Sequence, residues 1–290
     1  MSIKFMRFRI FYFLLSALAL AISLFSILRF GFRYSIDFTG GTIWEFSLST
    51  SDAPQKIEEI LNNESLPLSS LDQGLNQSFL LKTNPLTTTQ REKTVKAFKE
   101  LDPAWKELRF ETLGPSLGAE LLKKAIVAVF LSITAILFFV ASRFGGSIYG
   151  ISAILAMLHD SLILFGAFSL FGHFFKAELD TLFLTAVLTT LSFSVHDTIV
   201  VYDRIRELGQ KSRSLEALCD KAVTETLTRS LNNSMTIIFM LLALVLLGAP
   251  ATRWFALALL VGTVSGTYSS TFTAVPLVLA LNSLKKSPKN

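Results

Sequence analysis

The sequence predicts a membrane α-helical protein with six transmembrane helices and one small α+β domain between the first and the second. Three observations predict this fold class. Hydrophobic residues make up 51% of the 290 residues and charged residues only 17%, which is too apolar for a pair of soluble domains. Several uncharged stretches reach the roughly 18 residues that cross a bilayer. One long polar stretch follows the first of them, and strand and helix patterns alternate within it.

Four stretches are long and apolar enough to span a membrane without further assumption. They are residues 10–28, 125–142, 230–252 and 254–284. Two more, at about 147–171 and 179–201, reach spanning length only if each tolerates an internal histidine and aspartate. A protein with four spans would leave the apolar parts of these two stretches with nothing to bury them, so we favour six.

Basic residues beside the spans predict the orientation. Lys and Arg are retained on the cytoplasmic side, and they gather at both ends of the chain, at Arg143 and between the fourth and fifth spans. The two short connections on the other side hold only Lys176 and Arg253. Both termini are therefore expected inside. A cleaved signal peptide is a weaker alternative for the first span, because its apolar run continues to Leu28.

The polar stretch, residues 31–120, is expected outside as a small domain of its own. Its pattern predicts strands at 42–48, 66–71, 78–82 and 107–113, and helices at 53–62 and 88–101. This βαββαβ order is typical of a ferredoxin-like domain. Residues 1–30 would then be the cytoplasmic N-terminus and first transmembrane helix, and residues 121–290 a five-helix transmembrane domain with a cytoplasmic loop at 203–229.

Two histidine–aspartate pairs lie within predicted spans, His159 with Asp160 and His196 with Asp197. A charged aspartate at the centre of a span costs about 2.5 to 3.5 kcal/mol on insertion scales, so such residues usually face a protein interior or a hydrated path. Proton or ion handling is the default hypothesis, and hydrogen bonding between helices is the alternative. Ser194 and the other hydroxyl residues before Asp197 favour a hydrated relay.

Arg229, at the inner end of the fifth span, admits two interpretations. It is either a basic anchor at the cytoplasmic surface or the partner of a membrane carboxylate, which it would keep ionised until a proton arrives.

Other classes of function have less support. Histidine and aspartate can ligate zinc, but neighbouring residues on a helix point about 100° apart, and no His-Glu-x-x-His or Gly-x-Ser-x-Gly motif occurs. We expect no enzymatic activity, metal or cofactor. No Gly-x-x-x-x-Gly-Lys-Ser/Thr loop occurs either, which leaves the membrane gradient as the energy source. The chain has 27 basic and 22 acidic residues, and the excess of basic residues is concentrated beside the spans. Nucleic acid is therefore not an expected partner.

Several separated motifs resemble the SecD/SecF family, and its SecF members in particular. The run Asp37-Phe38-Thr39-Gly40-Gly41-Thr42 resembles the entry into the family's first outer domain, and Gly114-Pro115-Ser116-Leu117-Gly118 resembles the stretch before its second span. Leu158-His159-Asp160 is similar to its third-span motif. The longest likeness is the fourth-span run at 194–207, which contains Ser194 and His196-Asp197-Thr198. Residues 226–230 and 266–270 resemble motifs of the fifth and sixth spans.

The resemblance implies an accessory subunit of the Sec preprotein translocase in the bacterial inner membrane, driven by the proton motive force. The partners that it implies are SecD, the SecYEG translocon, the preprotein substrate, YajC and the lipid bilayer. It also implies that Asp197 and Arg229 take part in proton passage. His196 stands where asparagine is expected in many members, and it adds a titratable group beside Asp197. The remaining motif residues are expected to be structural: Asp37, Gly40, Gly41, Gly114 and Pro115.

Two alternatives stay open from the sequence. The family is similar to resistance-nodulation-division transporters, so a proton-coupled exporter of lipid or small molecules is one alternative. A purely structural subunit of the translocon is the other. A SecD-like partner that copurifies would favour the translocase, and export that survives the replacement of Asp197 would favour the structural subunit.

Overall fold

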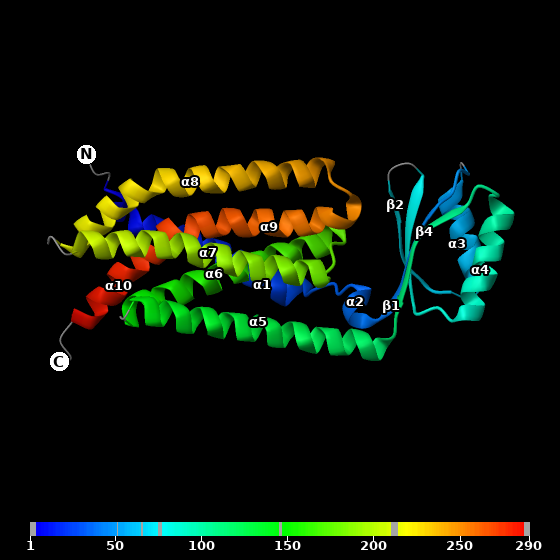
Figure 1. Cartoon of the computed structure of the whole chain (residues 1–290), viewed down its shortest axis with the longest axis horizontal. Coiled ribbons are helices and arrows are strands. Elements are labelled where there is room, and N and C mark those ends of the chain that lie inside the picture. The colour runs from blue at the N-terminus through cyan, green and yellow to red at the C-terminus, as the bar shows by residue number, and fades with distance from the viewer. Residues whose placement is uncertain are drawn as a thin grey trace. The chain divides into compact units, whose positions relative to one another are not determined.

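The computed structural model describes residues 4–50, 52–64, 66–74, 77–144, 147–209 and 214–286. The chain divides into two compact units, coloured along the chain in Figure 1. We call residues 34–126 the sheet unit, and residues 1–33 together with 127–290 the helical unit.

The sheet unit contains one antiparallel sheet of four strands with the order β2-β3-β1-β4. Its elements, in chain order, are α2 (Ile36–Thr39), β1 (Gly41–Ser47), α3 (Ala53–Asn63), β2 (Leu68–Gln73), β3 (Ser78–Thr83), α4 (Thr88–Leu101) and β4 (Lys106–Leu113). From β1 to β4 this is the predicted succession of strands and helices, and each boundary lies within two residues of the predicted one.

Alternation along β1 builds the core of the sheet unit. Trp44 and Phe46 are completely buried on one face of the strand, where Phe98 of α4 packs against both of their rings. Ile57 of α3 belongs to the same core. The N-terminus of α4 is fixed by a capping box in which the Thr87 hydroxyl accepts a hydrogen bond from the Gln90 backbone N–H.

The two glycine motifs of the sheet unit pack against each other. Gly40 has φ +78°, in the left-handed region that favours glycine. A Cβ at Gly40 would lie 2.7 Å from the Cα of Pro115, and a Cβ at Gly118 would lie 2.8 Å from the backbone N of Gly40. The close approach of the backbone therefore leaves no room for a side chain at either glycine.

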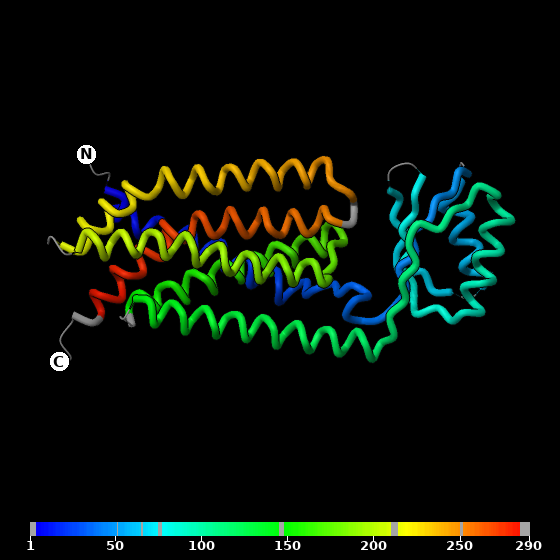
Figure 2. Tube along the Cα trace, in the orientation of Figure 1, coloured from blue at the N-terminus to red at the C-terminus, as the bar shows by residue number. Residues whose placement is uncertain are grey.

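Six helical segments among the described residues are long and apolar enough to cross a membrane, and all belong to the helical unit except the second, which belongs to it from residue 127 on. The helical unit begins with the 3₁₀ turn η1 (Phe5–Phe8) and α1 (Arg9–Phe30), and α1 begins at the same end of this unit at which α10 ends (Figure 2). The other elements are α5 (Pro115–Phe144), α6 (Ser147–Phe175), α7 (Thr181–Gly209), α8 (Leu215–Leu247), α9 (Pro250–Ser269), the π-helix η2 (Ser270–Ala274) and α10 (Val275–Lys286). The last three together form the sixth span, 252–284.

The segment 203–229, expected as a loop, is mostly helical. α7 continues to Gly209 and α8 begins at Leu215, while residues 210–213 lie outside the described residues. Apolar side chains persist on one face of each extension, and Arg204 bridges the two helices through a 2.6 Å bond to Glu225. Hydropathy is low on the N-terminal side of residue 230, but the amphipathic pattern of the helix continues there. The helix therefore starts earlier than hydropathy alone indicates.

The turn between the fifth and sixth spans lies within the outer connection expected at residues 248–253. α8 ends at Leu247 and α9 begins at Pro250, so the fifth span ends a few residues before its apolar stretch does. Proline has no N–H to donate, so it suits the first turn of a helix and starts α9 here.

Small residues let the spans approach closely. Gly262 and Gly266 lie four residues apart on the face of α9 that meets α7, where a Cβ on Gly262 would collide with the side chain of Thr190. Gly166 of α6 lies against Ser23 of α1 in the same way. This small-xxx-small spacing is typical of packed membrane helices.

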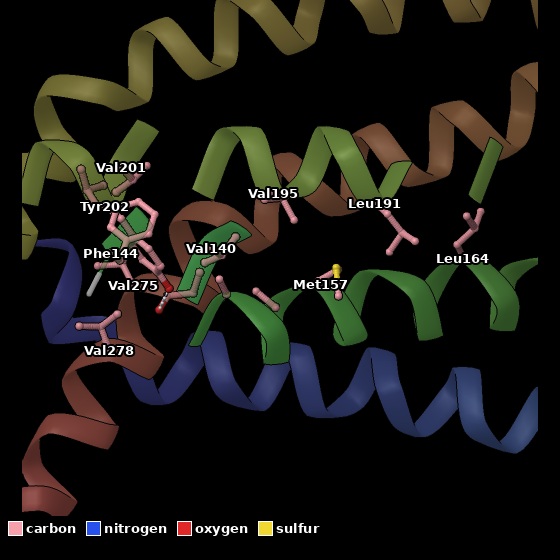
Figure 3. Packing of buried hydrophobic residues seen from close by; sticks show 14 of the residues in the cluster. Val140, Phe144, Met157, Leu164, Leu191, Val195, Val201, Tyr202, Val275 and Val278 are labelled. Atoms are coloured by element: carbon pink, nitrogen blue, oxygen red, sulfur yellow. Dashed lines mark hydrogen bonds between the residues drawn. The ribbon is translucent and has the colours of Figure 1, made fainter. Parts of the chain in front are cut away.

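Apolar side chains fill the space between the closely packed spans. Figure 3 shows Leu191 and Val195 on α7 beside Met157 and Leu164 on α6, all in one buried cluster.

Candidate functional site

The carboxylate of Asp197 is buried between α7 and α8. Asp197 is 5% exposed, and Ser230 of α8 donates a hydrogen bond of 2.8 Å to its Oδ2. Ser230 is itself buried, at 7% exposure. A carboxylate in a low-dielectric interior is costly to keep charged unless donors surround it, and Ser230 is the one side-chain donor to it among the described residues. This is the arrangement of a group that can take up and release a proton.

Arg229 and His196, the other predicted members of the relay, are both exposed in this chain. Ser230, the residue after Arg229, contacts Asp197, whereas Arg229 forms no ion pair with any described residue. His196 follows Ser192, Thr189 and Thr185 on one exposed face of α7. We call these four residues the polar stripe. The chain therefore assembles Asp197 in its interior and leaves the two basic members of the relay uncovered.

The second aspartate, Asp160 of α6, lies in a cage of donors. Its Oδ2 accepts 2.5 Å hydrogen bonds from the hydroxyls of Ser194 on α7 and Ser269 on α9. Its Oδ1 accepts a 2.7 Å bond from Ser265 on α9 and lies 3.0 Å from Nδ1 of His159. Asp160 is 1% exposed, so these contacts take the place of water. The predicted polar support by His159, Asp160 and Ser194 is thus a single cluster that joins three spans.

Three serines that were not predicted as site residues complete these sites. Ser230 follows Arg229 directly, and Ser265 and Ser269 lie four residues apart, on one face of α9. The spacing of Ser265 and Ser269 is the signal that could have found them. Their shared target, Asp160, is more than a hundred residues away in the chain, and only the fold reveals it.

Aromatic hydroxyls extend the polar network along the sixth span. The Tyr268 ring stacks on the His159 ring with centroids 6.3 Å apart, and its hydroxyl donates to the backbone oxygen of Tyr12 on α1. Tyr202 of α7 donates to the backbone oxygen of Ala274, the last residue of the π-helix η2. π-helical turns often occur at functional sites, and this one lies directly after Ser269.

The two His-Asp pairs do not form one metal site. Asp160 and Asp197 are each bonded to a different set of hydroxyls. Within the ranges that the structure describes, no three His, Cys, Asp or Glu side chains gather as metal ligands would.

Comparison with known proteins places this arrangement in a family. The family of the protein export membrane protein SecD/SecF, C-terminal, matches residues 93–284, which is well over half of the chain. The chain belongs to the SecD/SecF family. A second family pattern, the SecD/SecF GG motif, matches residues 25–51 and contains the Gly40-Gly41 turn.

Relatives within the family match the chain over nearly its whole length. The protein translocase subunit SecF of Thermobaculum terrenum is 38% identical and covers 96% of this chain and 93% of the relative. SecF of Sebaldella termitidis is 35% identical and covers 100% of this chain and 95% of the relative. The subunit SecDF of Thermus thermophilus is 34% identical over 94% of this chain, which corresponds to 37% of that longer protein.

A solved structure supports the same assignment. The crystal structure of SecDF from Thermus thermophilus, a translocon-associated membrane protein, has a TM-score of 0.85 and 33% identity to this chain. The match covers 98% of this chain and 39% of the solved one. Together with the six apolar helices, it shows a multi-pass membrane protein of this family.

Proposed function

We propose that this chain is an accessory subunit of the Sec protein translocase that uses the proton motive force to assist protein export across the bacterial inner membrane. Relatives of nearly equal length are translocase subunits named SecF, which supports the translocase role. The observation that carries the coupling to protons is the buried carboxylate of Asp197, held by Ser230 between two spans.

Asp197 supplies the charge that the gradient acts on. One elementary charge that crosses 100 mV provides roughly 2.3 kcal/mol. In the proposed cycle Asp197 takes a proton from the periplasmic side and releases it to the cytoplasm. Neutralising the carboxylate weakens its bond from Ser230, because a charged acceptor holds a donor more strongly than a neutral one does. The balance between two packings of α7 and α8 then shifts with each proton.

The partner SecD completes the relay. Thr185 and Thr189 of the polar stripe return their hydroxyls to carbonyls of their own helix, but His196 and Arg229 have no such acceptor among the described residues. Polar groups of this kind do not remain against lipid in a stable complex. We infer that SecD covers the stripe and places a carboxylate near Arg229. Relatives in which both parts form one SecDF chain support this pairing.

The sheet unit is the proposed periplasmic domain, and its strand order is that of a ferredoxin-like fold. In this proposal residues 31–120 receive the preprotein that leaves SecYEG, while both termini and the segment 203–229 face the cytoplasm. YajC is a further member of the assembly. In this proposal the chain needs no covalent catalysis, cofactor or metal of its own.

Maturation of a pulse-labelled secreted precursor tests the function. Cells depleted of their own copy receive the wild type, Asp197→Asn, or the control Asp203→Asn, at equal membrane levels. Asp203 lies six residues further along α7 and pairs at 3.1 Å with Arg143, so its replacement removes a carboxylate from the same helix but not from the relay. We expect wild type and Asp203→Asn to restore maturation and Asp197→Asn to fail. Equal rescue by all three chains would show a purely structural subunit, and rescue by none would favour the small-molecule exporter.

A further inference from the structure

His159 has one ring nitrogen in the donor cage of Asp160 and one outside it. Nδ1 lies 3.0 Å from Oδ1 of Asp160, while Nε2 is buried without any hydrogen-bond partner among the described residues. The side chain is 3% exposed. A buried polar atom without a partner requires an explanation, because such atoms are rare in folded proteins.

The contact with Asp160 favours one tautomer of the ring. Both oxygens of Asp160 already accept serine hydroxyls, so His159 suits this carboxylate as a fourth donor. In the tautomer in which Nδ1 donates to Asp160, the hydrogen of the neutral imidazole lies on Nδ1 and Nε2 carries a bare lone pair. An aspartate orients its histidine in the same way in hydrolytic triads, where the free Nε2 is the base.

We propose that Nε2 of His159 is a proton-binding site of this chain, distinct from Asp197. The ligand is the proton itself, and the product is an imidazolium paired with the Asp160 carboxylate. Ser194, Ser265 and Ser269 are positioning residues, since they hold the carboxylate that holds the ring.

Proton binding at this atom favours a different packing of the helices. The protonated ring acquires a donor at Nε2, for which the described residues provide no acceptor. Burying a donor without an acceptor is unfavourable, so the protonated state favours an arrangement that admits water or an acceptor to Nε2. Ser265, Ser269 and the stacked Tyr268 all belong to α9, so α9 is the element that responds.

Among the described residues, two titratable groups contact the ring. α6 contributes Asp160 and α9 contributes Tyr268, whose hydroxyl donates to the backbone oxygen of Tyr12 on α1. α7 presents Ser194 to the cage, and its own carboxylate, Asp197, is bonded to Ser230 instead. The charge of Asp160 therefore dominates the surroundings of the imidazole.

The site adds a second proton-binding group to the proposed proton-driven function. Its role in export rests on that proposed function, but proton binding itself does not. Proton binding to His159 is measurable in the isolated chain, so its failure and the failure of the proposed function can be told apart.

Nitrogen NMR of the full chain in lipid nanodiscs tests the site. The chain has 3 histidines, so the variant His173→Gln, His196→Gln leaves His159 as the single ¹⁵N-histidine signal. At high pH we expect an imidazole with its hydrogen on Nδ1, and on acidification a second hydrogen on Nε2. A ring with its hydrogen on Nε2 at high pH, or a ring that binds no proton between pH 4 and pH 9, would overturn the proposal.

Variants of the cage separate this role from packing. We expect Asp160→Asn to weaken proton binding at Nε2 at least about tenfold, because the paired charge is lost. If that variant does not fold, Ser269→Ala gives a second test and is expected to weaken binding by a smaller factor in the same direction. Ser161→Ala is the matched control, since the one bond of the Ser161 hydroxyl within the described part of the chain goes to the carbonyl of Met157 in its own helix. Equal titration curves for Ser269→Ala and Ser161→Ala would contradict the positioning role.

His159→Asn tests whether the site matters for export. Asparagine can keep the donor to Asp160 but has no atom that binds a proton in place of Nε2. We expect the variant to stay folded and to lose at least about half of the gradient-dependent part of the export rate. Unchanged export would overturn the role of His159 in transport, while failure of Asp197→Asn alone would still support the proposed function.

Discussion

Ser230 of α8 donates a hydrogen bond of 2.8 Å to Oδ2 of Asp197 of α7, and both side chains are buried. The bond joins two neighbouring spans through the one group whose charge the proposed cycle changes. It gives a physical link between the protonation state of Asp197 and the packing of α8 against α7.

Replacing Ser230 by alanine should destabilise the helical unit. Hydrogen bonds between membrane helices contribute about 0.6 kcal/mol on average and up to about 1.7, and the charged acceptor places this one toward the upper value. The free energy of unfolding in nanodiscs is the measurement. Thr134→Ala is the control, because Thr134 is exposed and bonds only the carbonyl of Phe130 in its own helix. Equal losses in the two variants would show that the bond to Asp197 contributes nothing.

Gly262→Ala should loosen the contact between α9 and α7. The new methyl group would collide with the side chain of Thr190, which is itself buried, and such overpacking costs about 1 to 3 kcal/mol. Gly150→Ala is a matched control in α6, since its Cβ would meet Ala141 at an ordinary distance of 3.7 Å. The control should be neutral or slightly stabilising, because alanine favours helix more than glycine does. Thermal unfolding that ranks the two variants the other way would contradict this packing.

The two glycine motifs of the sheet unit should differ in their tolerance of alanine. Gly40→Ala meets both a positive φ of +78° and the backbone of Pro115, so we expect a loss of about 1 to 3 kcal/mol. Gly114→Ala should be tolerated, because the nearest atom to its Cβ would be the Ser116 hydroxyl at 3.9 Å. Tryptophan fluorescence in a Trp254→Phe background reports on this unit, because the other two of the 3 tryptophans are Trp44 and Trp105. Similar losses for both glycines would contradict the structural assignment.

The polar stripe should be covered by SecD. A photo-crosslinking amino acid at Ser192, in the middle of the stripe, is expected to join the chain to co-expressed SecD. The same amino acid at Leu18 should not, because Leu18 is a 58% exposed apolar residue of α1, which packs mainly against α6. Products of the two positions are compared on denaturing gels. Crosslinks to SecD from Leu18 but not from Ser192 would place the partner on the other side of the helical unit.

Much of the fold could be predicted because its signals are local. Hydropathy found the six spans, and period-two alternation found the strands of the sheet unit, including β1 with Trp44 and Phe46. Asp197 was chosen as a candidate because a charge in a span is costly and therefore rare. The start of α8 was missed because charged residues lower the hydropathy at 215–229 while the helical pattern continues.

The donors around the two aspartates could not be predicted in the same way. Serine is common in membrane helices, and its hydroxyl can always return to a carbonyl of its own helix, as Ser161 does. Only tertiary packing decides that Ser265 and Ser269 bond Asp160 instead. Burial also decides that Arg229 faces away from Asp197, since residues 229 and 230 point in different directions on one helix.

The gradient dependence of export tests the central role of Asp197 most directly. Export of a precursor is followed in membranes that contain SecD with either the wild type or Asp197→Asn, with and without a protonophore that collapses the proton gradient. We expect the wild type to lose most of its stimulation of export when the gradient collapses, and Asp197→Asn to show the same low rate in both conditions. An Asp197→Asn chain that still stimulates export and still responds to the protonophore would contradict the account.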